Sequence, residues 1–490
     1  MSSSAMVARA VVWNVVTGVG ARIVGLIGTL VLARFIAPDE YGLVSVAAIC
    51  VSTAGQFSNL QLGQYLIVQG NREQGVAFHA AVFQLALGLA ALGGVWWLRD
   101  SLGPVFGAPG MGRFIPGFVL AAAIERVGQT PEKLLARDLR FRLIALTRGA
   151  GELCYTALAL SFAPSIGGMA IVVGNVGRAA LVATVFVASS DRQWLRPVRL
   201  SWTKSVAMFN YSSPLALARL TDFAAGRWDN LVISGFHGAG IAGTYNLAYN
   251  LSQTSTGTLA DQVLDVLFPS FASLEPKDRG RALVRALSSM SLLVMPLTFG
   301  LAAVATTLVT ALFPPRWGQI APMLVVLSVS AALLPLASTL LAFWRAQRRT
   351  GVVMIASAVR LALLLGALVT IGPLGPLWAC AAVDLSALGY LLLIWWTLRP
   401  DHRPIMWPAA RGMLQPMLAC LPMLAFVQGV QAIEPRLGPV VAPWALGLEI
   451  AAGAAGYAAG AFLFARDTAA DVTGLGRQLI LGKLSPGIWR

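Results

Sequence analysis

The sequence predicts an all-α, polytopic integral membrane protein, and three observations support this prediction. Apolar residues make up 57% of the 490 residues. Charged residues make up only 12%, against about 25% in ordinary globular chains. Long apolar runs recur along the whole chain, and short basic segments separate them. This composition excludes a soluble globular protein, a disordered chain, a collagen-like repeat and a coiled coil.

A membrane-spanning helix requires about 20 mostly apolar residues. We place about fourteen such helices, and an even number puts both chain ends on one side of the membrane. The predicted helices are 9–33, 41–63, 76–98, 113–128, 143–163, 165–189, 205–235, 240–268, 286–313, 319–344, 351–371, 376–398, 412–432 and 443–465. The first carries Arg22 and lacks a small-residue cleavage site after it, so we expect a retained helix rather than a signal peptide.

The basic residues indicate which side faces the cytoplasm. Of the 36 Lys and Arg residues, 26 lie in one set of loops or in the two tails, and 5 lie in the opposite loops. Arg126, Lys133 and Arg148 are counted among the 26. Because cytoplasmic loops are rich in Lys and Arg, we expect both termini in the cytoplasm. This placement, rather than a nucleic-acid groove, accounts for the net charge of +15.

Three segments on the cytoplasmic side have two open interpretations. Segments 131–142 and 275–285 mix charged and apolar residues, which fits amphipathic helices on the membrane surface or solvated loops. The tail 467–490 fits an interfacial helix or a disordered segment.

Motifs for catalysis and for metal binding are absent from the sequence. The cysteines stand singly in apolar runs, which favours neither a disulfide framework nor a zinc site. The chain contains no G-x-x-x-x-G-K-[ST] and no H-E-x-x-H motif, which excludes ATP binding through a P-loop. We therefore expect no enzyme activity, no metal and no cofactor other than a coupling H⁺ or Na⁺.

An internal repeat predicts how the helices are grouped. Segment 32–47 aligns without a gap with segment 233–248 at an offset of 201, with Phe35 on Phe236, Gly42 on Gly243 and Ala47 on Ala248. Each segment joins a long helix to a polar one, as in repeat-built transporters. We expect two pseudo-symmetric six-helix lobes, 1–200 and 201–400, around a central cavity. Two more helices (401–466) and a cytoplasmic tail (467–490) follow.

Polar residues form stripes on four helices that the repeat relates in two pairs. Residues three, four and seven positions apart share a helix face. The stripes comprise Asn14, Thr17, Gly18, Arg22 and Gly25; Ser45, Ser52, Gln56, Asn59 and Gly63; Arg219, Asp222, Gly226 and Asp229; and Asn246, Asn250, Gln253, Gly257, Asp261 and Asp265. Since lipid cannot satisfy polar groups, these stripes indicate a polar cavity, and the alternative is close helix packing with interhelical hydrogen bonds.

The stripes supply candidate binding residues of three kinds. Amide side chains both donate and accept hydrogen bonds, which suits the lining of a polar substrate cavity, and the candidates are Asn14, Gln56, Asn59, Asn246, Asn250 and Gln253. The guanidinium fork matches phosphate oxygens, and the candidates are Arg22, Arg219 and Arg227. Asp222, Asp229 and Asp261 are candidates for a coupling ion or for charge pairs with these arginines. For Glu152, Arg178 and Arg360, in other helices, we expect pairing between helices, such as Arg360 with Asp384.

Four stretches of sequence resemble the polysaccharide-export branch of the multidrug/oligosaccharidyl-lipid/polysaccharide exporter superfamily, which includes the Wzx-like O-antigen and exopolysaccharide flippases. The stretches are LARFIAPDEYGLVSVA (32–47), RWDNLVISGFHGAGIAGTYNLAYNL (227–251), FPSFASLEPKDRGRALVRALSSMSLLVMPLTFGL (268–301) and ALFPPRWGQIAPML (311–324). The resemblance implies a flippase for an undecaprenyl-diphosphate-linked oligosaccharide, working by alternating access in O-antigen, capsule or exopolysaccharide biosynthesis. It also implies a cationic cavity for the diphosphate, and a polysaccharide polymerase and other export components as partners.

A second interpretation is a cation-coupled multidrug or metabolite exporter of the same superfamily. Cationic substrates require acidic and aromatic residues in the cavity. An acidic cavity without paired bases favours the exporter, whereas unpaired bases favour the flippase.

Overall fold

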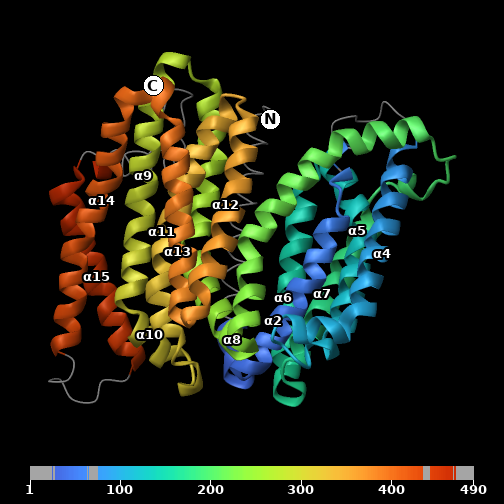
Figure 1. The fold of residues 1–490 in the computed structure, drawn as a ribbon, viewed down its shortest axis with the longest axis horizontal. Coiled ribbons are helices and arrows are strands. Elements are labelled where there is room, and N and C mark those ends of the chain that lie inside the picture. The colour runs from blue at the N-terminus through green and yellow to red at the C-terminus, as the bar shows by residue number, and fades with distance from the viewer. Residues whose placement is uncertain are drawn as a thin grey trace. The chain divides into compact units, whose positions relative to one another are not determined.

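The structure is a computed structural model that describes residues 25, 28–62, 64–65, 75–433, 442–466 and 468–470. The described residues form helices and connections, without a β-strand, which confirms the all-α prediction (Figure 1). The helices are α2 (Pro38–Ser58), α4 (Val76–Val105), α5 (Ile115–Arg137), α6 (Phe141–Ile166), α7 (Met169–Ser189), α8 (Trp202–Ser273), α9 (Pro276–Ala303), α10 (Ala305–Leu312), α11 (Ile320–Ala346), α12 (Thr350–Ile371), α13 (Pro376–Thr397), α14 (Arg399–Ile433) and α15 (Ala442–Phe464).

Ten helices in the described part of the chain are long and apolar enough to cross a membrane. The prediction of fourteen spans therefore stays a prediction. Helices α5 and α8 are not among the ten, although the sequence predicts membrane helices at both places. Both are polar along part of their length, and a helix that borders a polar cavity does not need to be apolar on every face.

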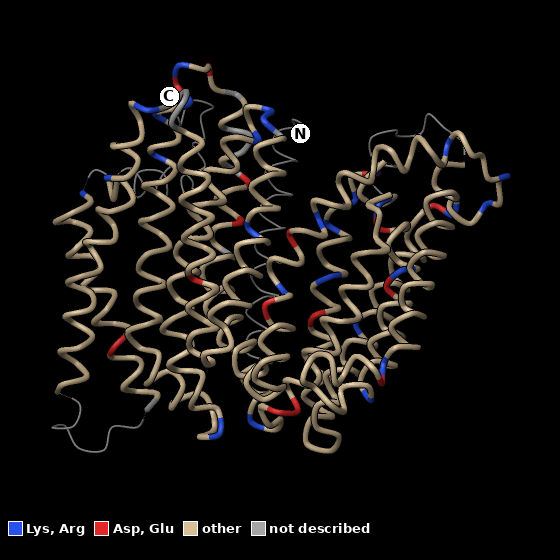
Figure 2. Tube along the Cα trace, in the orientation of Figure 1, with Lys and Arg blue, Asp and Glu red and all other residues tan. Residues whose placement is uncertain are grey.

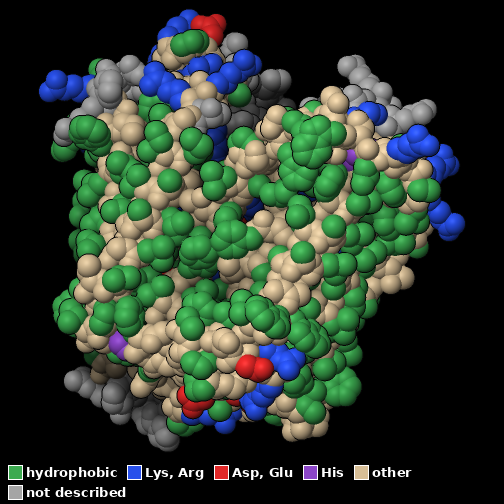
Figure 3. All heavy atoms as spheres, turned by 45° about the vertical axis from the view of Figure 1, so that its right-hand side comes forward, with side chains coloured by type: hydrophobic (Ala, Val, Ile, Leu, Met, Phe, Trp, Pro, Cys, Tyr) green, Lys and Arg blue, Asp and Glu red, His purple; other side chains and the backbone are tan. Residues whose placement is uncertain are grey.

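Large apolar side chains project outward from the helix flanks, while Lys and Arg gather near helix ends (Figure 3). Examples are Trp97, Leu153 and Ile355, whose side chains are 83%, 57% and 62% exposed. A protein in water does not leave so many large apolar side chains uncovered. The outward apolar surface indicates contact with lipid.

Helix α2 ends earlier than predicted, at Ser58 rather than at residue 63. The Ser58 hydroxyl donates to the carbonyl oxygens of Ala54 (3.0 Å) and Gly55 (3.1 Å). The Asn59 side-chain oxygen accepts from the Gln61 N–H at 3.3 Å, and Gln61 has a left-handed backbone with φ of 53°. These side-chain bonds compete with the helical ones and terminate the helix.

The segments 131–142 and 275–285 are not separate surface helices for most of their length. Helix α5 continues through Pro131 to Arg137, and α9 begins at Pro276. The extension of α5 buries Leu134 and Leu135 inside the protein, which explains why a charged segment remains helical. The left-handed residue Leu139 (φ 56°) then turns the chain toward α6.

Helix α8 contains one break, at Gly238 (φ 82°, ψ 169°). The break separates the two helices predicted at 205–235 and 240–268. At the repeat offset of 201, Gly238 corresponds to Ala37, which lies in the gap between the preceding helix and α2. The chain therefore changes direction at equivalent positions of the two repeats.

The chain divides into two compact units, residues 1–246 and 247–490. In the N-terminal unit, α4 packs on α5, and α5 and α6 both pack on α7. Lys and Arg gather at the end of the unit that holds the connections α5–α6 and α7–α8 (Figure 2). The Arg140 guanidinium, in the first of these connections, donates to the Ser189 carbonyl at 2.8 Å. This clustering agrees with the uneven distribution of basic residues in the sequence.

In the C-terminal unit, α14 packs on α9 and α15, and α11 packs on α9 and α13. The expected Arg360–Asp384 pair is absent, so that prediction is wrong. The Arg360 guanidinium lies over the Tyr390 ring, 5.5 Å from its centre, and Asp384 accepts from the Ser330 N–H at 2.9 Å. An aromatic face and a backbone donor satisfy the two charges separately.

Candidate functional site

The N-terminal unit encloses a polar cavity of about 670 Å³, a volume typical of small-molecule sites. Six helices contribute to its walls. The lining residues are Gln56, Asn59, Gln61, Gln64, Gln84, Glu125, Gly128, Gln129, Glu132, Lys133, Arg148, Glu152, Arg178, Ala179, Val182, Ala183, Phe186 and Arg219. Apolar side chains are the minority, so the cavity suits a hydrophilic ligand.

Six amide side chains contribute to the lining. They come from the end of α2 and the turn after it, from α4 and from α5, and they comprise Gln56, Asn59, Gln61, Gln64, Gln84 and Gln129. The early end of α2 is what brings the first four of these together around one helix terminus. Each amide offers both donors and acceptors, which matches the alternating needs of sugar hydroxyl groups.

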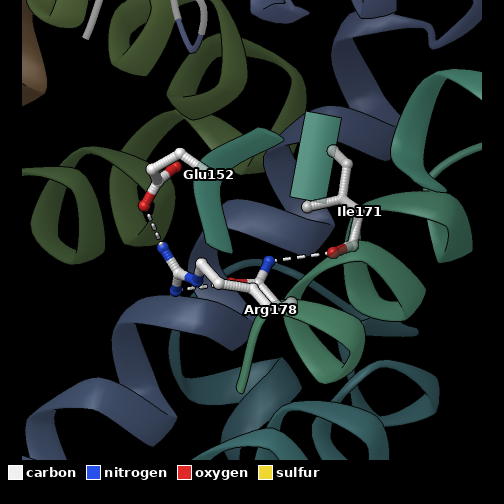
Figure 4. A network of polar contacts seen from close by, with 4 residues as sticks. Glu152, Ile171 and Arg178 are labelled. Atoms are coloured by element: carbon white, nitrogen blue, oxygen red, sulfur yellow. Dashed lines mark hydrogen bonds and ion pairs between the residues drawn. The ribbon is translucent and has the colours of Figure 1, made fainter. Parts of the chain in front are cut away.

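Four of the charged lining residues form two ion pairs. Arg148 pairs with Glu132. The Arg178 Nη1 atom donates to Glu152 Oε1 at 3.0 Å and thereby links α7 to α6. Figure 4 shows this pair, and the second nitrogen of Arg178 donates to Asn175 Oδ1 at 2.9 Å. Asn175 in turn donates to the Ile171 carbonyl at 2.8 Å, so the guanidinium is held at a fixed place in the wall.

Three charged lining residues make no ion pair with any residue that the structure describes: Glu125, Lys133 and Arg219. With the two ion pairs neutral, two cations face one carboxylate. The Arg219 side chain is exposed to the cavity. The uncompensated charge in the cavity is positive, which favours ligands with anionic oxygens.

The structure brings three predicted site residues together in this cavity: Gln56, Asn59 and Arg219. Ser45 and Ser52, from the same α2 stripe, line a smaller cavity of about 150 Å³ in the same unit. The polar stripe of α2 therefore faces cavities along its length rather than a packed neighbour.

Two other predicted residues of the N-terminal unit, Asp222 and Arg227, are exposed and do not line either cavity. Asp229 is buried and accepts hydrogen bonds from the Tyr245 hydroxyl and from the Asn230 N–H at 2.8 Å. The Asn246 amide donates to Asn230 at 2.9 Å. This buried cluster ties together the two parts of α8 on either side of its break.

The remaining candidates lie elsewhere. Asn250, Gln253 and Asp261 belong to the C-terminal unit, where Asp261 is exposed and the other two are half-buried. The buried Nε2 atom of Gln253 has no hydrogen-bond partner among the described residues. Asn14 and Arg22 lie outside the described residues. The binding roles of all these residues stay predictions.

Sequence reasoning missed most of the cavity wall that α5 and α6 provide. It counts Arg126, Lys133 and Arg148 with the basic residues of the cytoplasmic loops, although Arg126 and Arg148 also fall within the predicted helices 113–128 and 143–163. All three lie within helices. Lys133 and Arg148 line the cavity, and Arg126 is only 5% exposed. The signal was present, because Glu125, Gln129, Glu132 and Lys133 follow the spacing of one helix face. The many charged residues around Pro131 are also typical of a solvated loop, so the sequence alone does not identify this helix face.

Comparisons with known proteins agree with this architecture. A family model described as polysaccharide biosynthesis protein matches residues 31–322. The succinoglycan biosynthesis transport protein ExoT of Rhizobium meliloti is 24% identical over 433 residues, which cover 86% of each chain. The lipopolysaccharide biosynthesis protein WzxC of Escherichia coli is 26% identical over 325 residues, which cover 65% of each chain.

Solved structures share the fold at low sequence identity. The lipid II flippase MurJ, in an inward closed conformation, superposes with a TM-score of 0.77 at 14% identity, covering 93% of this chain and 99% of MurJ. An inward-facing multidrug resistance transporter of the MATE family gives a TM-score of 0.51 at 13% identity, covering 83% of this chain and 94% of that transporter. These likenesses concern the fold, and both solved proteins are membrane transporters.

The family match covers more than half of the chain, and the helices and their outward apolar surface are those of an integral, multi-pass membrane protein. The chain therefore belongs to the polysaccharide biosynthesis protein family, a Wzx-like branch of the multidrug/oligosaccharidyl-lipid/polysaccharide exporter superfamily whose members are transporters rather than enzymes.

Proposed function

We propose that this protein flips a lipid-linked oligosaccharide across the bacterial inner membrane for cell-surface polysaccharide biosynthesis, with both termini in the cytoplasm. The observation that carries the proposal is the cavity of the N-terminal unit, in which six amide side chains surround a surplus of positive charge. An oligosaccharide linked to a diphosphate requires both features. The names of the relatives ExoT and WzxC support the same class of cargo.

Different lining residues are proposed to bind different parts of the substrate. Arg219 and Lys133 lack ionic partners among the described residues, so they are available for diphosphate oxygens. The amides Gln56 and Asn59, at the end of α2, are available for sugar hydroxyls. Arg22 and Arg227 remain proposed diphosphate ligands on the basis of the sequence, and the lipid is proposed to be undecaprenyl diphosphate.

Translocation is proposed to follow alternating access, because the repeated helices allow the cavity to open to either side in turn. Asp222, Asp229 and Asp261 are the proposed sites for a coupling H⁺ or Na⁺. A polysaccharide polymerase is the proposed recipient of the flipped product.

The alternative, a multidrug or metabolite exporter, requires carboxylates that are free to meet a cationic drug. Of the three glutamates in the cavity, Glu132 and Glu152 are engaged by arginines, which leaves Glu125. The aromatic lining consists of Phe186 alone among the described residues. This charge balance supports the flippase over the exporter.

The test is complementation of a bacterial strain that lacks the gene. Arg219→Ala is expected to abolish surface polymer and to make the lipid-linked repeat unit accumulate at the cytoplasmic face, while the amount of protein in the membrane is unchanged. Arg196→Ala is the matched control, since Arg196 is exposed in the connection between α7 and α8, away from the cavity. Normal export by the Arg219→Ala protein would contradict the proposed role of the cavity.

A further inference from the structure

Arg126, in the middle of α5, is a buried arginine that forms no ion pair with any described residue, although the carboxylate of the adjacent Glu125 attracts it electrostatically. Its side chain is 5% exposed. The guanidinium donates to the Gly55 carbonyl on α2 and, through Nη1, to Gln129 Oε1 at 3.2 Å. Burying a guanidinium whose direct hydrogen-bond acceptors are all neutral is unfavourable, and such groups inside membrane proteins usually serve a function.

The neighbouring helices are built to make room for this side chain. A Cβ atom on Gly88 of α4 would lie 3.0 Å from Arg126 Cδ, and one on Gly55 would lie 3.1 Å from Arg126 Nη2. Glycines on two different helices therefore allow the guanidinium to approach. The contact with α2 also caps that helix, because the last carbonyls of a helix have no N–H donors in the helix itself and α2 has no basic residue in its last turn.

The decisive contact is the one with Gln129, which lines the cavity. Its side-chain oxygen accepts from Arg126 and also from the Gln84 amide. The Gln84 oxygen in turn accepts from the Thr130 hydroxyl at 3.4 Å. The Gln129 side-chain oxygen has two lone pairs, and its hydrogen bonds with Arg126 and Gln84 use both of them. The Gln129 Nε2 group makes no hydrogen bond with any described residue and is left to face the cavity.

We propose that Arg126 is a positioning residue that fixes the orientation of the Gln129 amide, so that Gln129 presents its N–H donors rather than its oxygen to the cavity. Lys133, one helical turn further along α5, lines the same cavity and also donates only. Gln129 and Lys133 can therefore donate hydrogen bonds to the oxygens of a phosphate or of a sugar. Arg126 itself never touches the ligand. The inference rests on the proposed function for the identity of that ligand.

The discriminating variant is Gln129→Glu. A carboxylate at this position keeps the shape of the side chain and pairs directly with Arg126, so the fold is retained or stabilised. It removes the two N–H donors from the cavity wall. Export is therefore expected to fall about tenfold, the effect of one lost hydrogen bond, while the melting temperature in detergent stays equal or rises. Normal export by this variant would contradict the positioning role.

A double-mutant cycle supplies the second readout, measured as the initial rate of surface polymer appearance per unit of membrane protein. Arg126→Met and Gln129→Ala are each expected to lower export about tenfold, and the double variant is expected to be no worse than either, because the residues act in series. Gln64→Ala is the control partner, since Gln64 lines the cavity without contacting Arg126, and its effect should multiply with that of Arg126→Met. If Arg126→Met does not reach the membrane, Gln129→Glu still decides the question.

The outcomes separate this inference from the proposed function. Normal export by both Gln129→Ala and Arg219→Ala would remove the cavity as the substrate site and would overturn both. Impaired export by Gln129→Ala together with normal export by Gln129→Glu, or with effects that multiply in the cycle, would overturn the positioning role alone.

Discussion

Gly42 on α2 and Gly243 on α8 occupy equivalent positions of the two sequence repeats and pack against each other. A Cβ atom on Gly243 would lie 2.7 Å from the Gly42 nitrogen, and one on Gly42 would lie 3.1 Å from the Gly243 nitrogen. Each added Cβ would also strike a backbone oxygen of the other segment, at Pro38 and Ala239, which are again repeat equivalents. A contact in which equivalent residues meet reciprocally is what a local two-fold axis produces.

The first prediction concerns this crossing. Gly42→Ala and Gly243→Ala are each expected to destabilise the protein by about 1–3 kcal/mol, because backbone cannot move aside as a flexible side chain can. The measurement is the thermal unfolding midpoint in detergent, followed by tryptophan fluorescence. Gly93→Ala on α4 is the control, since a Cβ there meets nothing within 4 Å and alanine favours the helix. Equal midpoints for Gly42→Ala and Gly93→Ala would mean that the crossing is loose.

The second prediction concerns the break in α8. Gly238 has φ of 82° and ψ of 169°, a backbone conformation open essentially to glycine alone. Gly238→Ala is expected to cost about 1–3 kcal/mol of stability even though the site has space for a methyl group. Gly235→Ala, three residues earlier in the helical part of α8, is the matched control. The same unfolding measurement checks the pair, and a Gly238→Ala protein as stable as the control would exclude backbone strain.

The sequence predicts the apolar helices well, because twenty apolar residues in a row have few alternatives to a membrane span. The repeat also places the turn at Gly238, since that alignment needs no knowledge of packing. The wall formed by α5 was not predictable in the same way. The sequence gives no reason to place the Arg126 side chain inside the protein until two glycines on other helices, Gly55 and Gly88, are known to surround it. A cavity that six helices share depends on which helices are neighbours, and that information is absent from any one helix face.

The third prediction tests the ion pair in the cavity wall. Arg178→Gln is expected to lower stability by about 0.5–1 kcal/mol, a modest effect because both side chains are about a third exposed. The exchanged variant Glu152→Arg/Arg178→Glu should recover part of this loss, but not all of it, since Asn175 loses its bond to the guanidinium. Thermal unfolding of Arg178→Gln, of the exchanged variant and of wild type gives the comparison. An exchanged variant no more stable than Arg178→Gln would show that the two charges do not support each other.

The last prediction uses the sign of the charge in the cavity. Glu125 and Lys133 both line it without an ionic partner among the described residues, so removing each should shift anion binding in opposite directions. Glu125→Gln is expected to tighten the binding of inorganic diphosphate about two- to fivefold, and Lys133→Gln to weaken it by a similar factor, as expected for single charges acting through a partly hydrated space. Calorimetry on the purified protein at low ionic strength measures both.

Because salt screens these interactions, the differences should shrink at about 1 M salt, where the Debye length is about 3 Å. Asp191→Asn is the control, since Asp191 is an exposed carboxylate outside the cavity and its removal should leave the affinity unchanged. Weaker diphosphate binding by Glu125→Gln would mean that the ligand does not respond to the cavity's positive charge.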